Sequence, residues 1–589
     1  MNLEIKRHSL AHILAQAVKN IYSDVKIATW PDTENGFYHD FDFWDIDFSE
    51  KDLKNVQKKM KKIIAQNQKF EKFVLPIDEA ISDLKNENDI YKLELAQKLK
   101  KQWEKELSFY RNVSQQREEK IIDMCKGPHV EQTSLLNTNS FKLVKVAWAY
   151  WLWDEKNKML TRIYAYAFEN KEKLDEYLKM LEEAKKRDHR ILWKKLDLFV
   201  FSDLVWSWLP LFTPEWTTIK EELQKEVEKI CYDYWFGKVM TPHLSKIELF
   251  EISGHADKFS EELFHVSSEQ KHDFVMKPVQ CPHQTQIYAS KPRSYKDLPI
   301  RYMESEKQYR AEKSWEVWWL SRVYAITVED WHSFCTVEQV KEEVIWMINI
   351  IKEFYTSLWM WWNHWVSLSV RDYENQQKYI WEPKDWDICE KMLEEVSDTL
   401  WLNAKKCEWE AALYWPKIDF MFKNAIWKEV QIPTVQLDFA TPKRFDLVYT
   451  DKDSSSKNPV MVHRAILWSY ERFMMLLIEH FAGIFPLWLS PRQVKIIPVV
   501  NKFYEYSKSI ELELKKNWIR VSWDYSSDWL NKKVRNAEKM HINYIIVIWE
   551  QEQNNNTVSV RNYKTKEQTC EKPEEFISRI LSEINERKL

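Results

Sequence analysis

The chain begins with apolar residues at the spacing of a helix. In HSLAHILAQAVKNIY, from His8 to Tyr22, leucine, isoleucine, alanine and valine recur every three or four positions, which predicts a helix with one buried face. The next segment, NGFYHDFDF, predicts a hairpin, and SEKDLKNVQKKMKKIIAQNQ predicts a lysine-rich helix with a solvated face. Residues 170–196 predict a charged connecting helix.

The rest of the chain alternates strand and helix patterns. Residues 209–250 predict a loop, a long helix and a strand that ends near Pro242. Residues 301–335 predict two strands around the polar loop AEKSWEVWWLS, with Arg310 on one arm and Arg322 on the other. Residues 491–589 alternate short apolar segments with helical ones, a pattern typical of a mixed sheet with helices.

Length and composition indicate a folded chain of several domains. The 589 residues predict three or four domains, and 44% hydrophobic with 30% charged residues is typical of globular proteins. A net charge of −4 gives no global signature of nucleic-acid binding, so any RNA-binding surface has to be local. There is no run of 18 apolar residues and no signal-peptide pattern, and the seven cysteines are scattered, so we expect a cytoplasmic protein.

The glycine and tryptophan contents are abnormal. The chain has 5 glycines and 32 tryptophans, whereas a chain of this length usually has roughly 40 glycines. Many tryptophans stand where a turn needs glycine, as in LVWSWLPLF (residues 204–212). Our hypothesis is that the gene reads UGA as glycine and was translated here with UGA as tryptophan; the alternative is a tryptophan-rich protein. Trp151, Trp386 and Trp488 are expected to be genuine.

Candidate chemistry is present at three places. Arg310 and Arg322 can bind a triphosphate, because guanidinium groups offer paired donors to phosphate oxygens, and Glu312 can accept from an amine. The alternative for this hairpin is a set of solvated salt bridges. Cys281, His332 and His463 can form a three-ligand zinc set that leaves one position open, although each could also be a packed core residue.

Four further residues could form the third of these sites. His8 and His12 lie four apart and share a helix face, and Cys125 and His129 follow far downstream in CKGPH. Two interpretations of these residue types compete: capped or core histidines, and a zinc site.

Several motifs together resemble threonyl-tRNA synthetases, a family of class II aminoacyl-tRNA synthetases. These motifs are KPVQCPHQTQIY, SYKDLPIRYMESEKQYRAE, LSRVYAITVEDWHSFCT, ALYWPKIDF, TVQLDF and PVMVHRAILWSYERF, in the order of the family. The resemblance runs from about His8 to the C-terminus. Reading glycine for several tryptophans, as in ALYGPKIDF, strengthens it.

The resemblance implies a multidomain α+β fold. An α/β editing domain would occupy residues 1–170, a connecting helix 171–196, a catalytic domain with the antiparallel sheet of class II synthetases 197–490, and an α/β anticodon-binding domain 491–589. The family often begins with a small ubiquitin-like domain; here HSLAH starts at His8, so that domain is expected to be absent or the gene start misassigned.

The resemblance also implies roles for individual residues. Zinc would be bound by Cys281, His332 and His463, one ion per catalytic site, with Asp330 binding the threonine beside it. Arg310, Glu312, Arg322 and Arg472 would bind ATP, which brings Mg²⁺. Tyr414, Lys417, Gln431 and Gln436 would line the same pocket, and His8, His12, Cys125 and His129 would edit. Val328 and Gln284 depart from the family's usual residues.

We therefore expect a threonine–tRNA ligase that uses ATP, L-threonine and threonine tRNA, forms a homodimer and hydrolyses seryl-tRNA. Threonine and serine differ by one methyl group, which discriminates by only about 1–3 kcal/mol, so an editing site is needed. One alternative is a catalytically inactive synthetase-like protein that binds RNA or edits, and another is a different class II specificity, such as serine or proline. Indoles at Trp318, Trp319, Trp331 and Trp415 are expected to block the ATP and threonine pocket.

Overall fold

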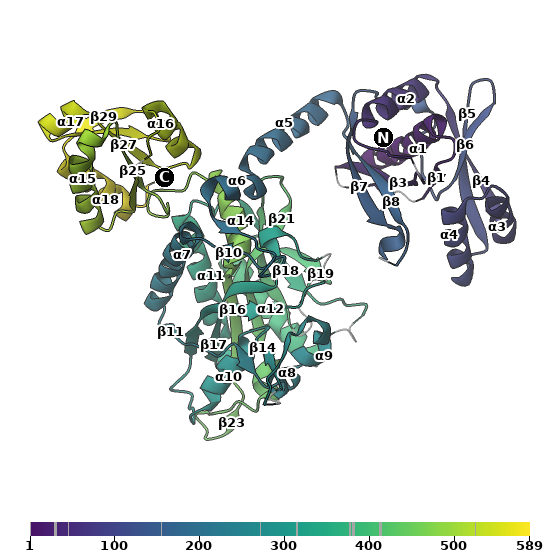
Figure 1. Cartoon of the computed structure of the whole chain (residues 1–589). Helices are drawn as coiled ribbons and strands as arrows, with labels where there is room; N and C mark the ends of the chain where they lie inside the picture. The colour runs from purple at the N-terminus through teal and green to yellow at the C-terminus, as the bar shows by residue number, and fades with distance from the viewer. Residues whose placement is uncertain are drawn as a thin grey trace. The chain divides into compact units, whose positions relative to one another are not determined.

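The computed structural model describes residues 2–588, except 29–31, 34, 45, 155, 271–272, 314–315, 376–378, 380–382, 412–414 and 525. The chain divides into two compact units, Met1–Glu182 and Glu183–Leu589 (Figure 1). Each unit has its own hydrophobic core, and each is described separately.

The first unit is built around helix α1. This helix, Leu3–Ile21, begins at Asn2, whose side chain accepts a hydrogen bond from the Glu4 amide, and it confirms the predicted helix. Its apolar face packs on α2 and β3 through Leu14, Val56 and Phe41. The predicted hairpin is β2 and β3, which pair antiparallel. The other elements of the unit are α2 (Leu53–Ala65), α3 (Ile77–Asn86), α4 (Ile90–Lys101), β1 (Lys26–Ile27), β2 (Asp32–Thr33), β3 (Gly36–Asp42), β4 (Lys69–Pro76), β5 (Glu106–Val113), β6 (Glu119–Met124), β7 (Phe141–Tyr150) and β8 (Met159–Ala167).

Two antiparallel sheets complete this unit. One has the order β1-β3-β8-β7, with β2 paired to β3, and the other has the order β4-β5-β6. The second sheet matters for function, because its strands bring Phe70 and Tyr110 onto the ring of His129.

The expected single connecting helix is two helices. Helix α5 spans Lys171–Arg187 and α6 spans His189–Leu196. Asp188 interrupts them: its side chain accepts a hydrogen bond from the Arg190 amide at 2.8 Å and begins α6. The prediction of one continuous helix was therefore wrong at this residue.

The second unit contains a large, mostly antiparallel sheet in the order β11-β15-β17-β24-β21-β20-β18-β19, with β16 paired to β17. Helices α7, α11 and α14 pack on it through a core that includes Leu223, Ile351 and Phe473. The bounds are β11 (Gly237–Lys238), β15 (Ile300–Met303), β16 (Ser305–Tyr309), β17 (Ala325–Cys335), β18 (His364–Val370), β19 (Lys405–Glu408), β20 (Lys417–Lys423), β21 (Glu429–Asp438), β24 (Val460–Ser469), α7 (Pro214–Asp233), α10 (Cys281–Ala289), α11 (Val340–Ser357), α12 (Pro383–Thr399) and α14 (Tyr470–Phe481).

Two predicted boundaries in this unit need correction. The strand expected to end near Pro242 is the two-residue β11, which ends at Lys238. Arg310 and Arg322 lie just beyond the ends of β16 and β17 and not within them, although the Arg310 amide still donates to the Tyr324 carbonyl at 2.9 Å. The two arginines therefore flank the loop, as the strand–loop–strand pattern requires.

The C-terminal part has the predicted mixed sheet. Its order is β26-β25-β27-β28-β29, parallel among the first three strands and antiparallel beyond. The elements are β25 (Val494–Pro498), β26 (Val521–Trp523), β27 (Tyr544–Ile548), β28 (Val558–Asn562), β29 (Gln568–Glu571), α15 (Tyr504–Lys516), α16 (Leu530–Lys539), α17 (Glu550–Asn555) and α18 (Pro573–Asn585). Across the described residues of the whole chain, no helix has the length and apolar character to cross a membrane.

Tryptophan occupies many positions with left-handed backbone. Among the described residues, 12 of the 25 non-glycine residues with positive φ are tryptophans. Five of them directly follow a helix end, where the next amide closes the helix by bonding to a carbonyl five residues back, as Phe236 does to Cys231 at 3.1 Å. Glycine usually fills this position, because a Cβ is strained there. These five, Trp103, Trp235, Trp359, Trp401 and Trp518, are 57–91% exposed. Burial therefore does not explain an indole at these positions, and the pattern favours the glycine hypothesis.

Glycine at three of these positions is expected to stabilise the second unit. A left-handed residue with a Cβ costs about 1–2 kcal/mol, so the triple variant Trp235→Gly/Trp359→Gly/Trp401→Gly should raise the midpoint of urea unfolding. The matched triple alanine variant removes the same indoles but keeps the Cβ, and it should gain much less. Equal gains in the two variants would contradict a backbone origin. In the gene, UGG codons at these three positions would refute the recoding hypothesis itself.

Candidate functional site

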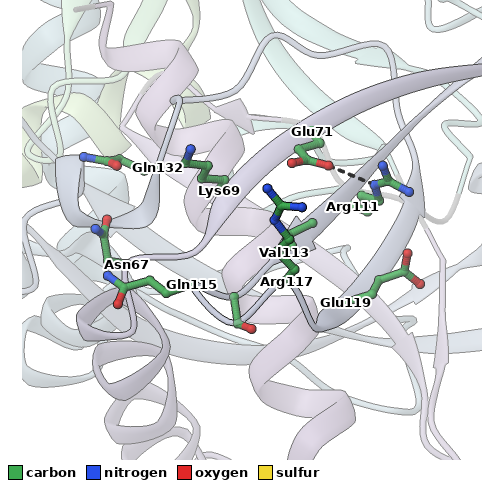
Figure 2. A pocket seen from close by; sticks show the side chains of 10 residues that line it. Asn67, Lys69, Glu71, Arg111, Val113, Gln115, Arg117, Glu119 and Gln132 are labelled. Atoms are coloured by element: carbon green, nitrogen blue, oxygen red, sulfur yellow. Dashed lines mark hydrogen bonds and ion pairs between the residues drawn. The ribbon is translucent and has the colours of Figure 1, made fainter.

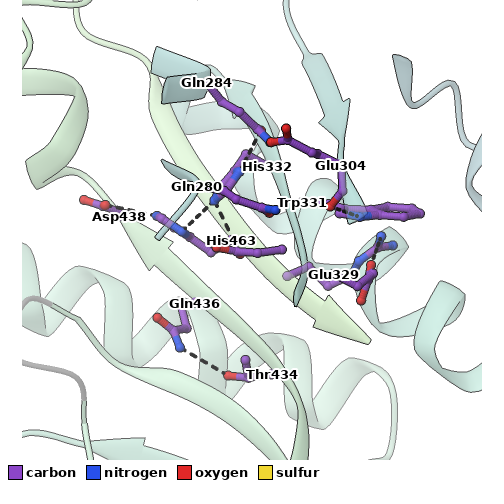
Figure 3. Close-up of polar contacts among 12 residues, drawn as sticks. Gln280, Gln284, Glu304, Glu329, Trp331, His332, Thr434, Gln436, Asp438 and His463 are labelled. Atoms are coloured by element: carbon purple, nitrogen blue, oxygen red, sulfur yellow. Dashed lines mark hydrogen bonds and ion pairs between the residues drawn. The ribbon is translucent and has the colours of Figure 1, made fainter. Parts of the chain in front are cut away.

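Three potential metal ligands meet on the large sheet. Cys281 is the first residue of α10, His332 lies on β17, and His463 lies directly opposite it on β24. One ligand atom from each lies within 4.8 Å of the others, and the Nε2 of His332 is 3.0 Å from the Nδ1 of His463. Figure 3 shows the two imidazoles facing each other. The fold thus gathers residues that are 182 positions apart in the chain into one group.

The second nitrogen of each histidine is already held. The Oε1 of Gln284 is 2.8 Å from Nδ1 of His332, and Oδ2 of Asp438 is 3.0 Å from Nε2 of His463. Histidines that bind metals usually have such a partner on the opposite nitrogen, which sets the ring orientation. The remaining nitrogens and the Cys281 thiol point at one another, so this donor set fits a metal ion.

The electrostatics of the group agree with metal binding. Burial raises the pKa of the Cys281 thiol well above its usual range and lowers the pKa of His332 well below its own. Burial also acts against charging His463, but the hydrogen bond and charge of Asp438 raise the pKa of that histidine. Thiolates and neutral imidazoles are the forms that bind metals; a cation at this place would draw the proton from Cys281.

A cavity of about 160 Å³ opens beside the group. Asp330 lines it, with its Oδ1 3.4 Å from Nε2 of His332, and burial raises the pKa of this carboxyl to about 6. The cavity also contains Arg310 and Trp468. The other residues that line it are His255, Val279, Cys281, Gln308, Val328, Thr434, Gln436, Asp438, Thr441, His463 and Ala465.

The predicted ATP residues lie close together. Nη2 of Arg322 pairs with Oε2 of Glu312 at 2.5 Å, and Nε of Arg472 donates to the Ser321 carbonyl at 3.1 Å. Burial, reinforced by the charges of Arg310 and Arg322, lowers the pKa of Arg472 to about 10. Three guanidinium groups around one space create a site that favours a polyanion.

The remaining predicted pocket residues are only partly brought together. Lys417 and Gln431 both contact Asp419, each at 2.6 Å, and Gln436, opposite Lys417 in the β20–β21 pair, lines the cavity. Tyr414 lies outside the described residues.

Trp468 is the tryptophan that lines this cavity. Its backbone has φ 58°, and the guanidinium of Arg472 lies 3.6 Å from the centre of its ring, with that of Arg310 5.9 Å away. Of the four tryptophans expected to block the pocket, Trp331 and Trp415 are fully buried in the core. Trp319 packs against that core, with its ring 6.0 Å from that of Trp208, and Trp318 is 57% exposed. The indole that meets the candidate phosphate-binding arginines is therefore a different one from those expected.

A second group of potential metal ligands lies in the first unit. One ligand atom from each of His8, His12, Cys125 and His129 lies within 4.8 Å of the others. Sγ of Cys125 is 3.0 Å from Nε2 of His8 and 3.5 Å from Nε2 of His129. The sequence spacing predicted that His8 and His12 share one helix face, and the fold brings Cys125 and His129 next to them.

Burial keeps this second group uncharged. It lowers the pKa of His8 to about 4 and raises the pKa of Cys125 to about 12, and it lowers the pKa values of His12 and His129 as well. Neutral imidazoles can accept a proton from water or bind a metal ion. The group can thus assist hydrolysis with or without a metal.

A polar cavity of about 630 Å³ lies on the face of the β4-β5-β6 sheet that is opposite to Phe70 and Tyr110 (Figure 2). Lys69, Arg111 and Arg117 line it, but Glu71 and Glu119 do so too, and Glu71 pairs with Arg111 at 3.1 Å. The opposite charges nearly cancel, so this cavity is not built for a polyanion.

Sequence reasoning missed three residues of the main site. Asp438 and Gln284 hold the two histidines, and His255, in GHADKF, lines the cavity. Asp438 could have been found, because it lies two residues after Gln436 on the same strand and therefore on the same face. Gln284, three residues after Cys281, was noticed only as a departure from the family; the structure gives it a partner.

Comparison with known families places the chain in a class. Residues 264–481 match the tRNA synthetase class II core domain (G, H, P, S and T), residues 493–583 an anticodon binding domain, and residues 112–164 the threonyl and alanyl tRNA synthetase second additional domain. With the sheet and the arginines described above, these matches define a class II aminoacyl-tRNA synthetase with an editing domain.

Individual relatives identify the family. The threonine–tRNA ligases of Staphylococcus aureus strains JH9 and Newman are 39% identical over 588 residues, which is 100% of this chain and 89% of theirs. The RNA binding domain of the threonyl-tRNA synthetase from Cryptosporidium parvum matches with a TM-score of 0.63 and 31% identity, over 67% of this chain and 98% of that chain. A prolyl-tRNA synthetase from Giardia lamblia shares the fold, with a TM-score of 0.53 at 15% identity, over 69% of this chain and 80% of that chain. The chain belongs to the threonine–tRNA ligase family, and nothing in these comparisons supports the inactive alternative.

Proposed function

We propose that this chain activates threonine with ATP, transfers it to threonine tRNA, and hydrolyses seryl-tRNA at a separate site. The observation that carries the proposal is the group Cys281, His332 and His463, which lies beside Asp330 in a cavity that also contains Arg310. A metal ion bound by this group would suit an amino acid with a hydroxyl group. The arginines next to it would suit the phosphates of a nucleotide.

The metal is proposed to be zinc, because one thiolate and two imidazoles leave one coordination position open for a substrate. When bound, zinc would supply a Lewis acid that attracts the amine and hydroxyl of threonine together. Asp330 would accept from the same amine or hydroxyl. Valine, which has the shape of threonine but no hydroxyl, would keep the contact through its amine and lose the bond from the hydroxyl to the metal.

The nucleotide is proposed to lie against the arginines, with Mg²⁺ accompanying ATP. Arg310, Arg322 and Arg472 would bind the phosphates, and Glu312 would exchange its contact with Arg322 for the adenine amine. Lys417, Gln431, Gln436 and Tyr414 are proposed to complete the pocket. Activation requires mainly positioning and charge stabilisation, which these groups would supply without a dedicated base.

The assembly is proposed to follow the family. Residues 1–170 would form the editing domain, 171–196 the connector, 197–490 the catalytic domain and 491–589 the anticodon-binding domain. Helix α7 would contribute to a homodimer interface. The C-terminal domain would contact the anticodon of the tRNA through its lysines and arginines.

The proposed activation is tested by threonine-dependent ATP–pyrophosphate exchange on two forms of the full chain, one with Trp468 and one with the substitution Trp468→Gly. Threonine should support exchange in at least one of the two, serine should support less, and valine almost none; a zinc chelator should abolish exchange, and added zinc should restore it. Folded, zinc-loaded protein that exchanges with no amino acid in either form would overturn the proposal.

The proposed editing is tested on threonine tRNA charged with serine. Replacing His129 with alanine is expected to slow hydrolysis of seryl-tRNA by roughly 100-fold, the usual contribution of a positioned acid–base group. Cys570→Ala changes an exposed cysteine of the second unit that does not belong to the group, and it should have no effect. Unchanged seryl-tRNA hydrolysis in the His129→Ala protein would remove this group from the reaction.

A further inference from the structure

Strand β24 is irregular between the candidate metal group and the candidate phosphate site. Asp330 pairs with Ala465, and Val328 pairs with Ser469. Glu329 therefore stands alone on β17 opposite three residues of β24: Ile466, Leu467 and Trp468. Such a bulge leaves backbone amides without ladder partners and bends the strand.

The side chain of Glu329 takes up the amides of the bulge. Its Oε2 accepts from the Leu467 amide at 3.3 Å and from the Ile466 amide at a shorter distance. Its Oε1 lies 3.3 Å from Nη2 of Arg464, and both side chains are fully buried. A buried carboxylate is stable only when it is paired and hydrogen-bonded in this way.

A second buried carboxylate holds the facing strand. Oε2 of Glu471, on α14, accepts from the Thr327 amide of β17 at 2.8 Å, and Oε1 accepts from the Thr327 hydroxyl at 3.0 Å. The two carboxylates thus tie β17, β24 and the start of α14 together, one from each side of the bulge.

The bulge lies between the two parts of the candidate active site. On one side of it, His463 pairs with His332 across the strands. On the other side, Ser469 begins α14 by accepting from the Arg472 amide at 3.1 Å. The conformation of residues 466–468 therefore sets where Arg472 lies relative to His463.

We propose that Glu329 and Glu471 are positioning residues for threonine activation, which hold the bulge that aligns Arg472 with Cys281, His332 and His463. Neither carboxylate lines the cavity described above. Glu329 contacts the amides of the bulge and Arg464, and Glu471 contacts Thr327 of β17 and Lys307, whose Nζ lies 3.1 Å from its Oε1. This assignment rests on the proposed activation of threonine.

The test compares Glu329→Ala, Glu329→Gln, Glu471→Ala and Glu390→Ala in the full chain. The parent is either the chain with Trp468 or its Trp468→Gly variant, whichever shows the faster exchange. Glu390 is the matched control: it is buried and accepts from the Arg371 amide at 3.1 Å, but it lies on α12, away from β17 and β24. Exchange kinetics give kcat and KM for ATP and for threonine, and hydrogen–deuterium exchange of peptides that contain Ile466 and Leu467 reports on the bulge.

Glu329→Ala should lower kcat by about 100-fold, because a misplacement of about 1 Å costs that much, and should speed deuterium uptake at Ile466 and Leu467. Glu329→Gln retains an acceptor oxygen, so it should keep most of the kcat and the slow deuterium uptake of the parent. Glu471→Ala should resemble Glu329→Ala. Glu390→Ala should change kcat less than twofold, whatever its loss of thermal stability.

Two negative results are distinguishable. If Glu329→Ala and Glu390→Ala lose similar stability and both keep the kcat of the parent, the carboxylates have only a structural role and the assignment is overturned. If the parent itself shows no threonine-dependent exchange, the proposed function fails first, and the positioning assignment falls with it.

Discussion

Replacing Trp468 with glycine is expected to raise threonine-dependent ATP–pyrophosphate exchange by about 100-fold or more, the scale on which geometry controls such reactions. The indole lies over Arg472 at 3.6 Å and lines the cavity with Arg310. Removing it frees both guanidinium groups for phosphate oxygens and enlarges a cavity of only about 160 Å³. Glycine also suits the φ of 58° at this position.

Two further variants separate these effects. Trp427→Gly is the matched control, because Trp427 has φ 62° and is exposed in the turn between β20 and β21; it should add stability and leave exchange unchanged. Trp468→Ala removes the indole but keeps a Cβ, so it should recover part of the exchange. If Trp468→Gly and Trp427→Gly have the same kinetic effect, the indole does not obstruct the site.

Replacing Cys281 with alanine is expected to remove the bound zinc and to lower kcat/KM for threonine by about 1000-fold. The reason is that a Lewis acid supplies several kcal/mol of stabilisation, and each 1.4 kcal/mol or so corresponds to a factor of ten. The preference for threonine over valine should fall at the same time, because the bond between the metal and the hydroxyl is proposed to supply most of that preference. Metal analysis of the purified protein and exchange with both amino acids measure the two effects.

Cys389→Ala provides the comparison for this variant. Cys389 is also buried in the second unit, but it belongs to α12 and not to the metal group. The Cys389→Ala protein should retain the zinc content and the threonine preference of the parent. If Cys281→Ala retains its zinc and its preference, the thiol is a core residue, which is the simpler interpretation that the sequence left open.

Local patterns predicted much of the fold. The apolar period of residues 8–22 gave α1, and the short apolar runs near the C-terminus gave β25, β27 and β28. The predicted ends of helices were less accurate where the hydrogen bond of a single polar side chain decides where a helix begins. Asp188 divides the connector because its carboxylate satisfies a free amide at the start of α6, a contact that competes with continuing the helix and that hydrophobic periodicity does not record.

By itself, the sequence determined the family and the residue types of both sites, because the motifs carry the ligands in order along the chain. It also gave the hypothesis that many tryptophans stand at glycine positions, since many of them occur where a turn or a helix end favours a residue without a Cβ. Only the tertiary structure decided which groups orient the ligands and which indole meets the arginines. Gln284, Asp438, Glu329 and Trp468 contact residues that are distant in sequence. Those contacts exist only after helix α10 packs on the sheet and the strands pair in one register.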